Sequence, residues 1–336
     1  MSCEASQESS EVSEDELGDV AARGLPSVAI LMATFNGSHY LSEQIESIAR
    51  QKDVKIVLFV SDDNSTDGTV PFIKTLCDQF GVEYRVLPTA GKFGGAARNF
   101  FRLLKDVDAA NFQYFSFSDQ DDIWQPEKLI LSIRALQNGT DAVSSDVTAF
   151  WPNGKRKDLI KSQPQRKFDF LFESAGPGCT FVLSAPLFIK LQELMRTHEH
   201  AFNCCALHDW AIYAVTRSLG YSWKILPAST LLYRQHSTNV VGARIGLGAI
   251  LKRFDLIREG WVYHQIQAVI DLVERCSPIV DADKIRDTIS QPSLMNRVRL
   301  CFMARHLRRK FADRCFMIFL FGSGLFWPKC TNKKLQ

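Results

Sequence analysis

Three carboxylates lie within four residues where an aromatic, apolar run ends. The run covers residues 112–117 and is followed by Ser118 and then by Asp119, Asp121 and Asp122. Like charges this close repel one another unless a cation, a partner or a shifted pKa compensates. Carboxylate oxygens are hard ligands that suit Mg²⁺ or Mn²⁺. The residue types therefore indicate either a divalent metal site or a solvated turn that caps the helix expected after Pro126.

The elements that must position these acids alternate along the first hundred residues of the globular part. Apolar runs at residues 27–33, 54–60, 84–87 and 112–117 predict four strands, and apolar residues at helical spacing predict three helices between them. This alternation is typical of a doubly wound α/β sheet. In such sheets ligands lie beyond the carboxyl ends of the strands.

Polar residues follow each predicted strand at that edge. They are Thr34 and Asn36 after the first strand, Asp62 and Asp63 after the second, Arg98 and Asn99 at the start of a later helix, and Asp119 and Asp121 after the fourth. The usual phosphate-binding fingerprints are missing, since there is no G-x-x-x-x-G-K-[ST], and Gly91-x-x-Gly94-Gly95 does not match G-x-G-x-x-G. The sequence therefore predicts neither a P-loop kinase nor an ordinary NAD enzyme.

Four segments, at residues 33–37, 60–68, 94–99 and 117–124, together resemble family 2 glycosyltransferases of the GT-A fold. The chain is most similar to bacterial rhamnosyltransferases that build surface polysaccharide, over roughly residues 26–245. The resemblance implies a Rossmann-like, mixed but mainly parallel sheet flanked by helices, followed here by a helical, basic C-terminal extension.

The resemblance also implies roles for the polar residues. The acid pair Asp62 and Asp63 would recognise the base of a sugar nucleotide, while Asp119 and Asp121 would bind its ribose and a diphosphate-bound Mg²⁺ or Mn²⁺. The structural alternatives are Asx turns made by Asp63 and Asp67 and a pairing of Arg98 with a nearby acid.

Further candidates lie in the second half of the chain. By resemblance, the Gly-Cys-Thr segment would place Gly178 and Thr180 beside the donor sugar, although a plain tight turn is the alternative. Asp209 precedes Trp210 at the head of a predicted helix, where it is either a helix cap or, as the resemblance implies, the general base. Arg234 and His236 would meet the diphosphate or its metal, against the alternative of a satisfied surface histidine.

Other segments of the second half are less specific. We expect strands at residues 141–147 and 221–226, a polar, basic loop at residues 151–167 and a helix over residues 249–275. Histidines and the adjacent pair Cys204 and Cys205 suggest zinc, but neighbouring cysteines rarely supply two ligands of one tetrahedral site. The nine cysteines show no metal-finger spacing, and no secretory signal is present, which favours reduced thiols in a cytoplasm.

The two ends of the chain differ in charge. Residues 1–22 hold seven acids and no Lys or Arg, which predicts disorder, whereas residues 291–336 hold ten Lys or Arg and the single acid Asp313. Basic residues interleaved with apolar and aromatic ones fit a segment lying on an anionic membrane surface. Core packing is the alternative, and nucleic-acid binding is disfavoured because no stacking platform or nucleic-acid fold signature is evident.

We therefore expect a disordered acidic tail at residues 1–24, a GT-A domain at residues 25–245 and a helical, membrane-associating region at residues 246–336. The GT-A domain would divide into a nucleotide-binding half, residues 25–125, and an acceptor or catalytic half, residues 126–245. The protein would be cytoplasmic, at the inner face of the cell membrane.

The predicted reaction is inverting transfer of a sugar from a nucleoside-diphosphate sugar to an acceptor hydroxyl. By resemblance the donor is dTDP-L-rhamnose, and the acceptor is a glycan or lipid-linked oligosaccharide of O-antigen or another surface polysaccharide. Two alternatives are a sugar-nucleotide nucleotidyltransferase and a non-catalytic protein that binds sugar nucleotides or membranes.

Overall fold

The computed structural model describes residues 24–236, 255–277 and 280–328. The first half alternates strands and helices, in the order β1 (Ser27–Thr34), α2 (Leu41–Ala49), β2 (Lys55–Asp62), α3 (Thr69–Phe80), β3 (Glu83–Val86), α4 (Ala96–Asp106), β4 (Tyr114–Ser118), β5 (Ile123–Trp124) and α5 (Lys128–Gln137). The four predicted strands and three predicted helices are confirmed. The predicted disordered tail lies outside the described residues.

The second half adds short strands and helices. These are β6 (Ala142–Phe150), β7 (Arg156–Leu159), η1 (Asp169–Leu171), η2 (Gly178–Thr180), β8 (Val182–Ser184), α6 (Ala185–Thr197), α7 (Glu199–Asn203), α8 (His208–Ser218) and β9 (Trp223–Arg234). The C-terminal helices are α10 (Trp261–Cys276), α11 (Val280–Ser290), α12 (Leu294–Leu307) and α13 (Phe311–Ser323).

Nine strands of the described chain form one mixed sheet, in the order β3-β2-β1-β4-β8-β6-β9-β5, with β7 paired to β6. Strands β1 to β4 are parallel to one another, whereas β8 is antiparallel to both β4 and β6. The carboxyl ends of β2, β1 and β4 therefore meet at one edge. The fold class predicted from the sequence is confirmed.

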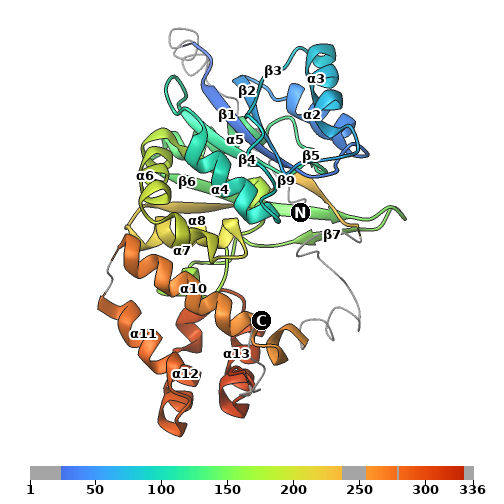
Figure 1. Cartoon of the computed structure of the whole chain (residues 1–336). Helices are drawn as coiled ribbons and strands as arrows, with labels where there is room; N and C mark the ends of the chain where they lie inside the picture. The colour runs from blue at the N-terminus through green and yellow to red at the C-terminus, as the bar shows by residue number, and fades with distance from the viewer. Residues whose placement is uncertain (1–23, 237–254, 278–279, 329–336) are drawn as a thin grey trace, which may run out of the picture.

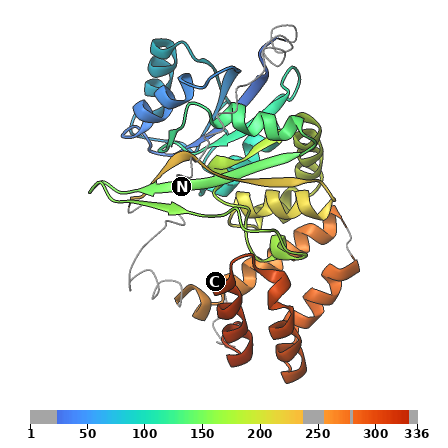
Figure 2. The ribbon, with the colours of Figure 1, turned by 180° about the vertical axis from the view of Figure 1, so that it is seen from behind.

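Both faces of the sheet are covered. Alternate residues of β1 point to opposite faces: Val28, Ile30 and Met32 join the core beneath α2, α3 and α5, while Ala29 and Leu31 join the core beneath α4, α6 and α8. The second core continues into α10, α12 and α13, through Leu300, Leu307, Leu320 and Phe321 among others. Figures 1 and 2 show these C-terminal helices gathered on the side of the sheet that carries α7 and α8.

Three expectations about local structure were wrong in part. The predicted loop at residues 151–167 contains β7, and the strand expected at residues 221–226 continues to Arg234 because β9 pairs with β6 and then with β5. The helix expected over residues 249–275 is interrupted at Gly260, whose φ of 78° lies in the left-handed region, so α10 begins at Trp261. Residues 249–254 lie outside the described residues.

Candidate active site

The loops after β1 and β2 are joined by hydrogen bonds around Asp62. Its carboxylate accepts from Thr34 Oγ1 at 2.8 Å and from the backbone N–H of Ser65 at 2.7 Å. The amide oxygen of Asn36 accepts from the backbone N–H of Thr66 at 2.9 Å. Asp62 thus makes an Asx-type turn and also ties the ends of two parallel strands together.

Asp63 is buried and holds the glycine-rich segment that precedes α4. Its carboxylate accepts from the backbone N–H groups of Phe93 and Gly94, the second at 3.0 Å. Asn99 is buried too, and its amide donates to the carbonyls of Thr34 at 3.2 Å and Ser61 at 2.9 Å. Asp63 and Asn99 therefore fix the backbone at the carboxyl ends of β1 and β2 and at the segment before α4.

Arg98 is exposed, and the described structure pairs it with no acid: its guanidinium lies 3.5 Å from the carbonyl of Phe93. The side chain therefore projects from the start of α4, next to the loops that contain the acids. This placement leaves its charge available to a ligand at the edge.

The loop after β4 is fixed by glutamine side chains that the sequence did not single out. Gln120 exchanges two hydrogen bonds with the backbone of Phe35, at 2.9 and 3.0 Å, and its side chain occupies the position that a Cβ on Gly37 would take. Gln44 accepts from the backbone N–H of Asp122 at 2.7 Å. The loop that contains the acids is thus bound to the loop after β1 and to α2.

Asp121 faces His236, which follows β9. Its Oδ2 lies 2.5 Å from His236 Nε2, and the imidazole stacks on Tyr40 with the ring centroids 5.1 Å apart. Arg234 donates through Nε to the backbone carbonyl of Asp121 at 2.7 Å and through Nη2 to Glu43 at 2.6 Å. In the described structure Arg234 therefore fixes the loop after β4 by donating to the backbone carbonyl of Asp121.

Asp119 and Asp122 lie together beside Cys179. One ligand atom from each of the three lies within 4.8 Å of the others, the metal-ligand grouping found among the described residues. Burial and the charge of Asp121 raise the pKa of Asp119 to about 7, and the same causes raise the pKa of Asp122. A group of carboxylates with raised pKa values in a partly buried site is typical of a place that receives a cation.

The donor set fits a divalent ion, but the side chains are not equally suited to ligation. Burial and the neighbouring acids raise the pKa of Cys179 well above its usual value, and a sulfur atom is a soft ligand that suits a hard ion poorly. Asp122 is fully buried and accepts from the backbone N–H of Arg234 at 3.0 Å. Asp121 and His236, which were predicted as ligands together with Asp119, contact each other beside this grouping rather than within it.

A buried lysine lies beneath this acidic loop. Lys128 Nζ contacts the ring of Trp124 at 3.4 Å and donates to Ser116 Oγ at 3.0 Å. Burial lowers the pKa of Lys128 to about 7, against the opposing influence of Cys179 and Asp122. Its sequence position, two residues after Pro126 in a predicted helix, gave no signal of this placement.

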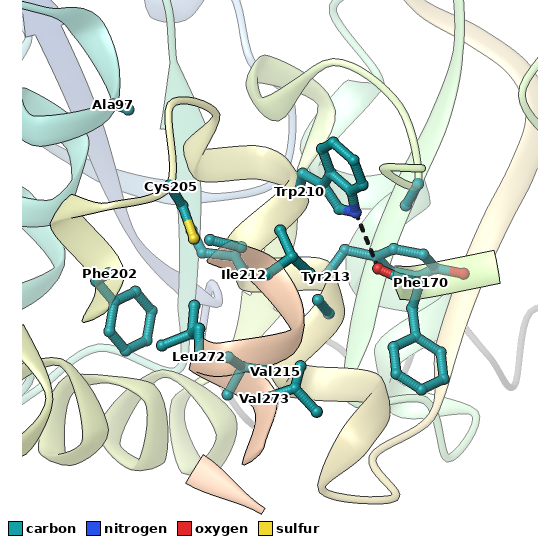
Figure 3. Close-up of a cluster of buried hydrophobic side chains, with 14 of the residues drawn as sticks. Ala97, Phe170, Phe202, Cys205, Trp210, Ile212, Tyr213, Val215, Leu272 and Val273 are labelled. Atoms are coloured by element: carbon teal, nitrogen blue, oxygen red, sulfur yellow. Dashed lines mark hydrogen bonds between the residues drawn. The ribbon is translucent and has the colours of Figure 1, made fainter. Parts of the chain in front are cut away.

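Asp209 lies in the first turn of α8, next to the acidic loop. Burial raises the pKa of Asp209 to about 6, although a hydrogen bond from the backbone N–H of Trp210, the charge of Lys161 and the hydroxyl of Ser174 act in the opposite direction. The charge of Asp209 in turn contributes to the raised pKa of Asp119. The two carboxylates therefore lie near enough to interact electrostatically. Trp210 and Tyr213, from the same helix, point toward Phe170 (Figure 3).

The Gly-Cys-Thr segment forms η2 and packs against α8. A Cβ built on Gly178 would lie 2.2 Å from His208 Nε2, and Thr180 is buried with its hydroxyl donating to the carbonyl of Pro177 at 2.7 Å. His208 stacks on Phe100 at 3.9 Å, and burial lowers its pKa to about 3. Gly178 is therefore required for this packing, and Thr180 makes the turn that was the structural alternative.

The predicted site residues thus form two adjoining groups at one edge of the sheet. One group surrounds Asp62 and Asp63 after β2, and the other surrounds Asp119 and Asp121 after β4 and includes Asp209. Hydrogen bonds between Gln120 and Phe35 join the loops that carry the two groups.

The chain matches one family model and several known proteins. Residues 29–207 match the model of the family described as glycosyl transferase family 2. The chain is 38% identical over 300 residues to dTDP-rhamnosyl transferase RfbG of Shigella flexneri, which covers 88% of this chain and 100% of that protein. It is 31% identical over 158 residues to UDP-Glc:alpha-D-GlcNAc-diphosphoundecaprenol beta-1,3-glucosyltransferase WfgD of Escherichia coli, covering 46% of this chain and 59% of the relative. Among solved structures, S. aureus TarS 1–349 in complex with UDP-GlcNAc aligns with a TM-score of 0.48 and 13% identity over 89% of this chain and 90% of that one.

Proposed function

The chain belongs to glycosyltransferase family 2 and is a glycosyltransferase, and from that premise we propose that it transfers L-rhamnose from dTDP-L-rhamnose to an acceptor hydroxyl of a surface-polysaccharide precursor. The observation that carries the donor assignment is the 38% identity to a dTDP-rhamnosyl transferase over that protein's whole length. A glycan or lipid-linked oligosaccharide is the acceptor class. The family match gives no support to the nucleotidyltransferase alternative.

The donor would lie across the edge formed by the ends of β2, β1 and β4. In this proposal Asp62 and Asp63 recognise the base, with Thr34, Asn36, Asn99 and Arg98 around them, and Gly178 and Thr180 border the sugar. Asp119 contacts the ribose or the metal. Arg234 approaches the diphosphate from β9. The hydrogen bonds within this edge support a preorganised site, since its backbone groups are already held in place.

Asp119, Asp121 and His236 would hold Mg²⁺ or Mn²⁺. When bound there, a divalent ion supplies Lewis-acid stabilisation of the negative charge that the leaving diphosphate acquires. The hydrogen bond between Asp121 Oδ2 and His236 Nε2 supports this assignment, since it places a carboxylate and an imidazole, two types of metal ligand, side by side.

Asp209 would act as the general base. Its carboxylate accepts the proton of the acceptor hydroxyl as the oxygen attacks the anomeric carbon, and the carbon–oxygen bond to the diphosphate breaks. A single displacement inverts the configuration, so a β-L donor gives an α-L-rhamnoside. A pKa raised to about 6 supports this role, because the group is ionised at neutral pH and still basic enough to accept a proton.

The experiment that tests the proposal is incubation of the purified protein with a panel of sugar nucleotides and Mn²⁺ or Mg²⁺, with release of the nucleoside diphosphate as the measurement. Release from dTDP-L-rhamnose in the presence of a cell-envelope lipid extract supports the proposed donor. Release from a uridine or guanosine donor alone contradicts it.

The proposal includes binding to an anionic membrane surface through α12 and α13, at the inner face of the cell membrane. Met295, Phe302 and Phe311 are 71 to 77% exposed, and Arg305 and Arg314 lie among them. These two arginines and Phe302 line a groove of about 320 Å³ between the helices. In the described part of the chain no helix is long and apolar enough to cross a membrane. A basic, apolar surface fits attachment from one side, at about 1 kcal/mol for each Lys or Arg near the lipid.

We assign residues 25–245 to catalysis and residues 246–336 to attachment, with nucleotide binding in residues 25–125 and acceptor binding and catalysis in residues 126–245. The acidic residues that we assign to the donor lie in the first of these halves, and Asp209 lies in the second. The exposed apolar residues of α12 and α13 support the role given to the C-terminal region.

A further inference from the structure

The segment at residues 168–174 lies between α8, which carries Asp209, and the connection between α12 and α13. The backbone N–H of Phe168 donates to the carbonyl of His306 at 3.0 Å, and Arg308 Nη1 donates to the carbonyl of Phe172 at 2.5 Å. These contacts join parts of the chain that are more than 130 residues apart. They bring the C-terminal helices into direct contact with the segment that precedes η2.

Arg309 makes the most extensive of these contacts, and its side chain is only 1% exposed. Its Nη1 donates to Asp169 Oδ2 at 3.2 Å and its Nη2 to the carbonyl of Ser174 at 2.6 Å. Its backbone N–H donates to Glu173 Oε1 at 2.5 Å. One residue thus binds both ends of the segment at residues 169–174.

Asp169 connects Arg309 to α8. It is fully buried and accepts from Tyr213 Oη at 3.0 Å and from Arg217 Nη1 at 3.4 Å, both on α8. Arg217 also donates to Tyr213 Oη at 2.8 Å. Each arginine of this network thus faces a carboxylate, since Arg217 and Arg309 both contact Asp169 and Arg309 also pairs with Glu173.

The same segment contacts α8 within one residue of Asp209. Trp210 Nε1 donates to the carbonyl of Phe170 at 2.9 Å, a bond drawn in Figure 3 together with Tyr213. At the other end of the segment, the carbonyl of Ser174 accepts from Arg309 Nη2. The first turn of α8 is therefore held through Trp210 by a segment whose own position depends on Arg309.

A buried ionic network of this kind is a poor source of stability compared with apolar packing, because each charge loses its hydration. Its geometric precision is high, since a guanidinium donates in fixed directions to several acceptors at once. The geometry points to Arg309 as a positioning residue that fixes the general base Asp209 through residues 169–174. This inference rests on the proposed function, because it takes Asp209 as the base, and it extends the active site's support to a residue outside the family match at residues 29–207.

The test compares Arg309→Met, Arg309→Lys and Tyr213→Phe with wild type in the full-length protein. Arg258→Met is the matched control, because Arg258 is 78% exposed and pairs with Asp255 outside this network. The measurements are kcat, the KM for dTDP-L-rhamnose, the Kd and stoichiometry of dTDP binding, and the melting temperature. The stoichiometry of dTDP binding gives the fraction of the protein that is folded, and kcat is then expressed per folded molecule.

We expect Arg309→Met to lower kcat per folded molecule by about 10- to 100-fold, as small misplacements of catalytic groups do, with the donor KM and the dTDP Kd within about twofold of wild type. Arg309→Lys should recover part of the loss, and Tyr213→Phe should lower kcat by a few fold. If Arg309→Met does not fold, the other two variants decide. Wild-type kcat in Arg309→Lys and Tyr213→Phe, or a loss of activity that follows the folded fraction alone, overturns the inference.

Asp209→Asn separates this inference from the proposed function. If Asp209→Asn turns over normally, the base is assigned wrongly and the proposed mechanism fails. If Asp209→Asn is inactive while the network variants behave like wild type, only the role of Arg309 fails.

Discussion

The imidazole Nε2 of His236 lies 2.5 Å from the Oδ2 of Asp121, although the two residues are separated by 115 positions in the chain. The pairing of β9 with β5 produces this approach, because it brings the end of β9 beside the loop after β4. Tyr40 stacks on the imidazole and the guanidinium of Arg234 lies 4.7 Å from the centroid of the same tyrosine ring. The two candidate ligands are thus held by three separate segments.

Removal of either candidate ligand should weaken metal-dependent donor binding. We expect Asp121→Asn and His236→Ala to reduce the affinity for dTDP in the presence of Mn²⁺ by at least about 10-fold, while the weak binding that persists in a chelator stays unchanged. Isothermal titration calorimetry with and without Mn²⁺ measures both. Asp78→Asn, an exposed acid on α3, is the control. Equal affinities with and without metal in the wild-type protein would contradict the metal assignment.

Activity should depend on the ionisation of Asp209. The base accepts a proton only as a carboxylate, and its pKa is raised to about 6, so kcat/KM should be constant above that pH and fall about tenfold per pH unit below it. Asp209→Asn should keep dTDP binding and lower kcat by about 10²- to 10⁴-fold. A pH series of initial rates and a binding titration of the variant check the two expectations. A variant with normal turnover would exclude Asp209 as the base.

Gly178→Ala should disturb both stability and catalysis. The new Cβ would lie 2.2 Å from His208 Nε2, in a place where the imidazole is packed against Phe100, so the ring or η2 must move. We expect the free energy of unfolding to fall by about 1–3 kcal/mol and kcat to fall with it. Unfolding in denaturant measures the free energy of unfolding, and initial rates measure kcat.

Gly322→Ala is the control for this substitution. A Cβ there would meet only Cys301 Sγ, at an ordinary 3.9 Å, and the residue lies within helix α13, where alanine is the better helix former. Its free energy of unfolding should stay equal or rise. A loss as large as that of Gly178→Ala would show that the close approach to His208 is not the cause.

Membrane binding should depend on the exposed face of α12 and α13. Phe302→Ser combined with Phe311→Ser should reduce the fraction of protein that sediments with anionic vesicles, and Arg305→Glu combined with Arg314→Glu should reduce it further at low salt. Leu131→Ser, on a half-exposed residue of α5, is the control. Neutral vesicles should bind less than anionic ones. Equal sedimentation of all variants with both kinds of vesicle contradicts the proposed attachment.

The front half of the fold could be predicted from the sequence because its strands are buried on both faces. Such strands appear as continuous apolar runs, as in β1, β2 and β4, and the polar residues that follow them mark the edge of the sheet where the candidate site lies. Strand β7 was missed because it lies at the margin of the sheet, mostly exposed, and its sequence Arg-Lys-Asp-Leu has no apolar run. The extension of β9 was missed because Pro227 and Ser229 interrupt its apolar pattern.

The parts of the site that could not be predicted depend on tertiary contacts. Gln44 and Gln120 have no special spacing, yet they hold the loop after β4 through hydrogen bonds to backbone groups distant in sequence. Cys179 was seen only as part of a Gly-Cys-Thr segment, and its approach to Asp119 and Asp122 follows from the packing of η2 against β4. The sequence shows three acids within four residues, but it does not show which of them are buried.

The buried cluster that begins under β1 and β4 passes without interruption through α8 and α10 to Leu307 and Phe321. Among the described residues this apolar cluster runs beside the buried ionic network of Asp169 and Arg309, and both join the sheet to the C-terminal helices, so unfolding of either part would expose the interior of the other to water. Thermal denaturation of this chain should therefore be a single cooperative transition. A variant shortened to residues 25–245 would expose the apolar surface that α10, α12 and α13 cover, and we expect it to aggregate.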